Sequence, residues 1–273
     1  MKIGIISSGN ETLTLRKVLT KYNHEYLVYH DQTFFPFGEK NLDFIVQNLL
    51  SYSTFLQSQG AEAIILDPIY ELAISQRAEQ TAKNLILPLF QTYLQDEVLP
   101  YSLVGKIGLL TDKWSLSQAQ NIFSQTVSDY QPTPTQQATK KFQFPFNYRI
   151  KSPQARPAGI IDLWVHNPYL IKTLKNDLKY FKDANVDTVI PLHYQYFAMQ
   201  RTIKSCFNHH KTRFFDLSFI EKSFKKLTTE SKYSVQLRTN QSPAFLTEKK
   251  SLMRLLERGE TQPITINTLP ITH

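Results

Sequence analysis

Short apolar runs alternate along this chain with longer amphipathic segments. The short runs are rich in Ile, Val and Leu, as expected of strands that are covered on both faces. They lie within residues 2–9, 26–31, 63–67, 105–112, 187–191 and 212–216. Helical spacing of apolar residues predicts helices at residues 11–22, 42–59, 68–83, from Ser115 onward, 169–184, 218–227 and 246–259. This alternation predicts an α/β fold with mostly parallel sheets.

Local signals indicate where several of these elements begin and end. Gly60 is expected to end the second helix, and Ser218 with Glu221 three residues later predicts an N-cap with a capping box. Residues 131–157 are rich in Pro, Gln, Thr and aromatic residues, which predicts a long irregular excursion to which no role is assigned. The tail after Pro263 has no periodicity and is expected to be loose.

The segment at residues 187–194, D-T-V-I-P-L-H-Y, joins a buried strand to polar residues. Two β-branched residues suit the strand, and Pro191, which lacks a backbone donor, is expected to end its pairing. Ligands of α/β sheets usually lie just past the carboxyl ends of strands. His193 and Tyr194 are therefore candidate site residues.

Composition is typical of a soluble globular protein, with 41% hydrophobic residues and a mean hydropathy of −0.32. No apolar run approaches the ~20 residues that a membrane-spanning helix needs. The N-terminus has only a few apolar residues before Ser7, against the roughly 7–15 of a secretory signal. A cytoplasmic protein without a membrane partner is expected.

The charge balance is basic, with a net charge of +8. The basic residues are scattered, so no specific nucleic-acid partner is expected, although an acidic protein partner is permitted. The single cysteine, Cys206, excludes an intramolecular disulfide and a multi-cysteine metal site. With His209 and His210 it has the residue types of a metal site, but a buried structural thiol is the favoured interpretation. No metal or cofactor is expected.

Both signatures of the glutamate racemase family have counterparts in this chain. Residues 187–194 resemble the second signature, D-T-L-I-L-G-C-T-H-Y-P, and Pro191 stands where the family has a catalytic cysteine. The matching positions are Asp187, Thr188, His193 and Tyr194. The first signature, V-x-A-C-N-T-A-S, falls on residues 66–73, and there Asp67 stands in place of the other cysteine.

The N-terminal region resembles the same family at two further places. Residues 3–14 resemble the opening I-G-V-F-D-S-G-V-G-G-L-T, in which Ser7 replaces an aspartate that assists catalysis. Residues 31–40 resemble D-T-x-x-x-P-Y-G-x-K, a loop that contacts the amino-acid substrate in relatives. The substrate-binding positions implied by the resemblance are Ser7, Ser8, Pro36, Phe37, Gly38 and Tyr194.

The resemblance implies two pseudo-symmetric, three-layer α/β domains, and residues 105–112 restart the strand and turn of the N-terminus. The first domain is expected to comprise residues 1–97 plus 208–273, and the second residues 98–207. The resemblance further implies a bacterial protein connected with peptidoglycan biosynthesis, and a homodimer.

Racemising an α-carbon requires a base on one face and an acid on the other. Asp67 offers a carboxylate, but Pro191 has no proton to exchange. The favoured hypothesis is a racemase homologue that is catalytically inactive, a pseudoenzyme with a binding or regulatory role. Its ligand would be a small amino acid or carboxylate, and its partner DNA gyrase, which some relatives inhibit, or another acidic protein.

Two alternatives remain open. Asp67 and His193 would form an acid–base pair acting on an amino acid or a related carboxylate, because a buried carboxyl group and an imidazole both titrate near neutral pH. The other alternative is a conventional racemase.

Overall fold

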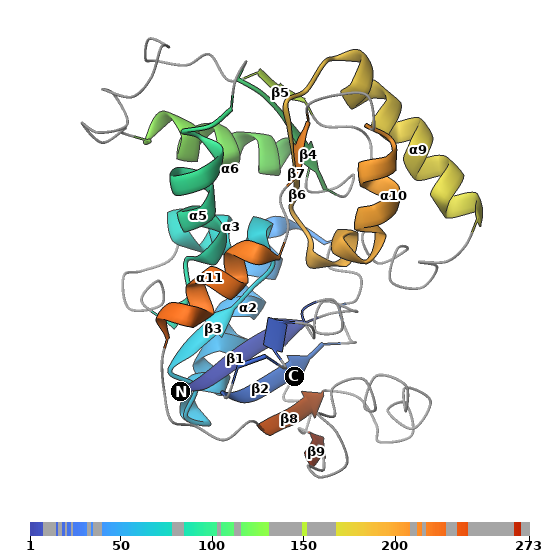
Figure 1. Cartoon of the computed structure of the whole chain (residues 1–273). Coiled ribbons are helices and arrows are strands. Elements are labelled where there is room, and N and C mark those ends of the chain that lie inside the picture. The colour runs from blue at the N-terminus through green and yellow to red at the C-terminus, as the bar shows by residue number, and fades with distance from the viewer. Residues whose placement is uncertain are drawn as a thin grey trace.

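In the computed structural model of the protein, two parallel sheets are accompanied by helices (Figure 1). The structure describes residues 1–7, 15, 18–19, 21–22, 24–31, 34, 40–77, 85–102, 105–111, 116–130, 149–151, 168–207, 212–214, 217–227, 234–239 and 265–268. The expected α/β fold with parallel sheets is confirmed.

The first sheet has the strand order β3-β1-β2-β8-β9, and every neighbouring pair is parallel. Its strands are β1 (Lys2–Ser7), β2 (Glu25–His30), β3 (Ala63–Ile65), β8 (Ser234–Thr239) and β9 (Thr265–Thr268). The three strands at one end of this order are almost wholly buried, as their continuous apolar runs predict.

The second sheet has the order β5-β4-β6-β7, again with parallel pairs throughout. Its strands are β4 (Lys106–Leu110), β5 (Arg149–Lys151), β6 (Thr188–Pro191) and β7 (Arg213–Phe214). The first strand of each half lies between the next two strands of that half, so β3-β1-β2 corresponds to β6-β4-β5. This shared order supports the internal repeat that the sequence indicates.

Helices connect the strands and cover the sheets (Figure 1). They are α2 (Leu42–Ser58), α3 (Pro68–Arg77), α5 (Leu89–Tyr93) with the π-helical turn η2 (Leu94–Val98), α6 (Leu116–Ser128), α9 (Pro168–Asp183), the 3₁₀ turn η3 (Tyr194–Met199), α10 (Gln200–Ser205) and α11 (Ser218–Lys226). The side chain of Asn41 caps α2, and Gly60, at φ 92°, follows its end as predicted. No helix in the described ranges is both long and apolar enough to cross a membrane.

One apolar core joins the two halves. Its buried residues include Ile5 and Ile64 from the first sheet and Ile107 and Ile190 from the second. A second apolar cluster joins the second sheet to α9 and α10. Helix α6 packs against α3, and the side-chain amide of Gln76 on α3 donates to the backbone oxygen of Ile122 on α6 at 3.0 Å.

Two sequence expectations differ from the structure. The N-cap of α11 is Leu217, one residue before the expected Ser218, and the Leu217 side chain has no group that could cap the helix. The tail after Pro263 contains β9, which pairs with β8 through its backbone despite having no apolar period. Strand β7, which follows residue 207, pairs with β6 in the second sheet.

Other expectations lie outside the described residues. Only residues 149–151 of the excursion at 131–157 are described, and they form β5. The helix expected at 246–259 lies outside the described ranges, as does most of the helix expected at 11–22. The division into two domains stays a prediction.

Candidate functional site

Asp67 and His193 occupy equivalent places in the two halves. Asp67 comes just after β3 and immediately before α3, and His193 comes just after β6 and immediately before η3. Both therefore lie at the carboxyl end of a parallel strand, where the sequence placed the candidate site. The backbone N–H of Ile69 donates to the oxygen of Leu192 at 3.2 Å, which joins the two strand ends directly.

Asp67 contacts two groups of the opposite half. Its Oδ2 lies 3.1 Å from Nδ1 of His193, and its Oδ1 accepts the backbone N–H of Tyr194 at 2.8 Å. The Asp67 side chain is 3% exposed and that of His193 is 2% exposed. Both carboxylate oxygens are therefore engaged within the protein, in a place closed to solvent.

Thr111 extends this chain of polar contacts. Its Oγ1 lies 3.3 Å from Nε2 of His193, and its backbone oxygen accepts the hydroxyl of Tyr196 at 3.0 Å. The ring of Tyr70 lies edge-on to the imidazole, with centroids 5.7 Å apart. Both ring nitrogens of His193 thus have partners. The carboxylate of Asp67, the imidazole of His193 and the hydroxyl of Thr111 form one buried series of polar contacts.

A second carboxyl group, Glu71, is buried close to this series. It lies one helical turn after Asp67 and accepts the backbone N–H groups of Phe90 at 2.9 Å and Gln91 at 2.7 Å. Burial raises the pKa of Glu71 to about 8, although these backbone hydrogen bonds act in the opposite direction. Glu71 was not among the predicted site residues, because a glutamate is almost never fully buried unless it is paired.

Tyr194 places a phenol among these carboxyl groups. Its side chain is 1% exposed, and its hydroxyl has no hydrogen-bond partner among the described residues. Burial raises the pKa of Tyr194 well above its ordinary value, and the nearby charges of Glu71 and Asp67 add to the effect. The Tyr194 hydroxyl is therefore a donor held neutral in a buried place.

A second cluster of polar side chains lies at the carboxyl ends of β1 and β2. Ser7 ends β1, is 1% exposed, and has its Oγ 3.3 Å from Nδ1 of His30. Asp31 accepts the hydroxyl of Tyr52 at 2.7 Å and the backbone N–H of Phe34 at 3.2 Å. Burial and this bond to Asp31 raise the pKa of Tyr52.

The structure places only part of the predicted site. Asp67, His193 and Tyr194 come together, and Ser7 lies at the end of a strand in the same sheet as β3. Ser8, Pro36, Phe37 and Gly38 lie outside the described residues. Thr111 was not predicted as a site residue, although its place after β4 corresponds to that of Ser7 at the end of β1.

This arrangement limits the chemistry available. Pro191, the final residue of β6, pairs with Leu110 and carries no titratable group. Asp67 and His193 contact each other, whereas two-base chemistry requires groups on opposite sides of one carbon. No group of three or more potential metal ligands occurs among the described residues. Cys206 is half-buried, and the neighbouring His209 and His210 lie outside the described ranges.

Comparisons with known proteins agree with the resemblance in the sequence. No protein-family model matches the chain. It is 33% identical over 92 residues to glutamate racemases from two serovars of Leptospira interrogans, a match that covers 33% of this chain and spans about a third of the length of those relatives (35%).

Two solved structures are similar over nearly the whole chain. The glutamate racemase isoform RacE1 from Bacillus anthracis has a TM-score of 0.72 at 15% identity, covering 98% of this chain and 97% of its own. Glutamate racemase from Francisella tularensis, in complex with D-glutamate, has a TM-score of 0.69 at 16% identity with the same coverage. The fold predicted from the sequence resemblance is confirmed.

Proposed function

We propose that this protein, a member of the racemase family, does not racemise amino acids and acts instead by binding. The observation that carries the proposal is the position of Asp67. At the place of the family's first cysteine, this side chain has both oxygens engaged with His193 and Tyr194 of the opposite half.

Two physical arguments support the loss of racemase chemistry. Proton removal and proton delivery must occur on opposite faces of the α-carbon, and Pro191, in place of the second cysteine, exchanges no proton. A carboxylate that accepts a backbone N–H and contacts an imidazole stabilises the junction between two chain segments. Asp67 therefore has a structural role where an enzyme would need a mobile proton.

The proposed ligand is a small amino acid or a related carboxylate. The Francisella structure contains D-glutamate, and the positions that the sequence resemblance gives for substrate contacts are Ser7, Ser8, Pro36, Phe37, Gly38 and Tyr194. The hydroxyl of Tyr194, which has no hydrogen-bond partner among the residues that the structure describes, supports this assignment, because such a buried donor gains a hydrogen bond from a ligand carboxylate.

The proposed regulatory role involves an acidic protein partner in a bacterial cytoplasm. The net charge of +8 favours association with an acidic surface. DNA gyrase is the specific candidate, from the family resemblance, and a homodimer and a link to peptidoglycan biosynthesis belong to the same proposal. Retention of gyrase by the immobilised protein at low salt is expected, and no retention under those conditions counts against gyrase as the partner.

A second candidate function uses Asp67 and His193 as an acid–base pair. The contact of 3.1 Å between them, continued by Thr111 at 3.3 Å, favours it, because a carboxylate that orients an imidazole is a common general-base arrangement. In this candidate, one base acts on one face of an amino acid or related carboxylate. It requires the buried imidazole to become accessible to the substrate.

One experiment separates the two functions. Both enantiomers of glutamate and aspartate are incubated with the protein in heavy water, and proton NMR follows the α-proton. The binding proposal expects no deuterium at the α-carbon, together with measurable heat of glutamate binding in calorimetry. Exchange that is lost in both Asp67→Ala and His193→Ala, with each variant still folded, would instead establish the acid–base pair.

A further inference from the structure

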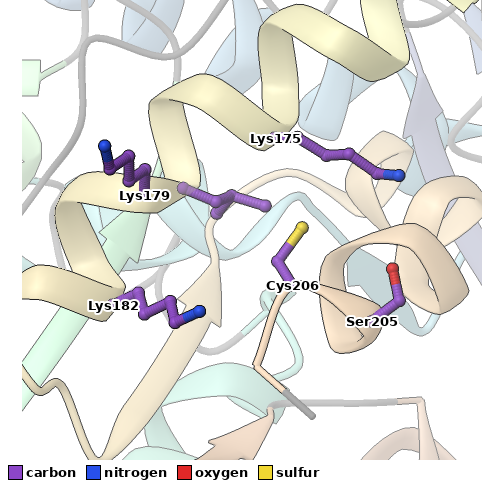
Figure 2. Close-up of a pocket in the computed structure, with 6 residues that line it drawn as sticks. Lys175, Lys179, Lys182, Ser205 and Cys206 are labelled. Atoms are coloured by element: carbon purple, nitrogen blue, oxygen red, sulfur yellow. The ribbon is translucent and has the colours of Figure 1, made fainter. Parts of the chain in front are cut away.

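A cavity of about 290 Å³ lies between α9 and the end of α10 (Figure 2). It is lined by Lys175, Leu178, Lys179, Lys182, Ser205 and Cys206. None of these residues belongs to the candidate site described above. The lining is basic, with three lysines and no acidic residue, so the cavity has the character of an anion site.

Within the described ranges, no acidic side chain neutralises these lysines. No carboxylate in the described part of the chain forms an ion pair with Lys175, Lys179 or Lys182. Lys179 is four residues after Lys175 and three before Lys182, so the three side chains are neighbours on α9. Like charges at these spacings destabilise a helix. Lys182 is favoured near the end of α9 by the helix dipole, but Lys175 lies in the middle of the helix and has no such compensation.

Two of these lysines, Lys175 and Lys182, flank the thiol of Cys206. Figure 2 shows Lys175 and Lys182 on either side of the thiol, with the amine of Lys179 pointing away. The thiol donates to the backbone oxygen of Thr202 at 3.3 Å. Burial raises the pKa of Cys206, while the positive charges of Lys175 and Lys182 act to lower it. The electric field of both lysines therefore reaches the cavity wall.

We propose that this cavity binds a small molecule carrying phosphate groups, held between the ammonium groups of Lys175 and Lys182 and packed on Leu178. Lysine binds phosphate as a point charge, and a multiply charged phosphate neutralises more than one lysine at once. The volume is at the small end of the range for ligand pockets, which suits a diphosphate-sized group. The site is independent of the proposed function, since it shares no residue with it.

Cys206 provides a direct measurement, because it is the only cysteine in the chain. The rate of its reaction with N-ethylmaleimide, an uncharged reagent, is measured at constant ionic strength with pyrophosphate, inorganic phosphate, succinate or sodium chloride. We expect pyrophosphate to slow the reaction several-fold and saturably, phosphate to act more weakly, and succinate and chloride to have little effect. Protection by pyrophosphate no greater than that by chloride overturns the proposal, and equal protection by succinate overturns its assignment to phosphate.

Matched variants locate the effect. The double variant Lys175→Ala/Lys182→Ala is expected to lose the protection. Lys172→Ala/Lys225→Ala removes the same charge from exposed positions that do not line the cavity, and it is expected to keep the protection. Protection that persists equally in both variants assigns the effect to net charge and contradicts the site. The wild-type comparison with chloride stands whether or not either variant folds.

Discussion

The backbone N–H of Tyr194 donates to Oδ1 of Asp67 at 2.8 Å, so a side chain at the end of β3 holds the main chain that follows β6. Equivalent strand ends of the two halves are joined at the place where the glutamate racemase signatures that this sequence resembles have cysteines. The junction is buried, and a carboxylate there satisfies a backbone donor that a thiol would satisfy weakly. An aspartate at this place therefore has a structural consequence.

This bond predicts a large loss of stability in Asp67→Ala. The substitution leaves the buried N–H of Tyr194 and one ring nitrogen of His193 without their acceptor, which costs on the order of 3 kcal/mol in the free energy of unfolding. Asp67→Asn keeps an oxygen for Tyr194 and is expected to lose less. Urea denaturation measures both, with Asp129→Ala, an exposed site, as the control. Equal stability of Asp67→Ala and the control would contradict a structural role for Asp67.

The sequence predicts the strands of both sheets well where they are apolar and poorly where they are not. β1, β2 and β4 were recognisable because strands buried on both faces need continuous apolar residues. β8 and β9 were missed, because they are short and interleave apolar with polar residues instead of forming a continuous apolar run. Such a short alternation is a weaker signal than an unbroken apolar run.

The sequence identified some residues of the candidate site, but it did not indicate which of them contact each other. Asp67 and His193 were identified by their places in the two signatures, yet they are 126 residues apart, and their contact depends on the meeting of two sheets. Glu71 was missed because its burial results from the start of α5, which lies about twenty residues further along the chain. All residues from Pro68 to Ile74 of α3 are buried, so helical spacing within α3 does not indicate that contact.

The buried carboxyl group of Glu71 is expected to make the free energy of unfolding decrease as the pH rises. Its pKa is about 8 in the folded protein against 4.5 for the ordinary group, so between these values the folded state binds more protons than the unfolded state. The stabilisation is complete below pH 4.5 and is lost progressively as the pH rises to about 8. The slope approaches about 1.4 kcal/mol per pH unit within that window.

Urea denaturation at a series of pH values tests this prediction. Glu71→Gln is expected to flatten the decline between pH 5 and 8, even though the amide is a poorer acceptor for the backbone N–H groups of Phe90 and Gln91. The exposed Glu62→Gln serves as the matched control and is expected to retain the wild-type slope. A Glu71→Gln variant with the same slope as wild type would show that Glu71 does not bind the proton.

Tyr194→Phe is predicted to separate stability from ligand binding. Removing a buried hydroxyl that has no partner in the described part of the chain relieves a desolvation penalty, so the free energy of unfolding should stay the same or rise by about 1 kcal/mol. Binding of glutamate should weaken about tenfold if this hydroxyl meets the ligand carboxylate. Thermal unfolding and calorimetry measure the two effects. Unchanged binding with unchanged stability would remove Tyr194 from the ligand site.

Gly108 of β4 lies where α9 packs closely against the second sheet. A Cβ at this position would lie 2.9 to 3.0 Å from three ring carbons of Phe181, a fully buried residue of α9. Gly108→Ala should therefore destabilise the protein by about 1–3 kcal/mol. At Gly4, by contrast, the nearest atoms are Cδ1 of Leu56 at 3.0 Å and Cγ1 of Ile64 at 3.1 Å, which belong to aliphatic side chains and not to a rigid ring, so Gly4→Ala should cost less. Because the ring is the obstacle, Phe181→Leu in the Gly108→Ala background should recover part of the loss, and strictly additive losses in the double variant would show that the two residues do not meet.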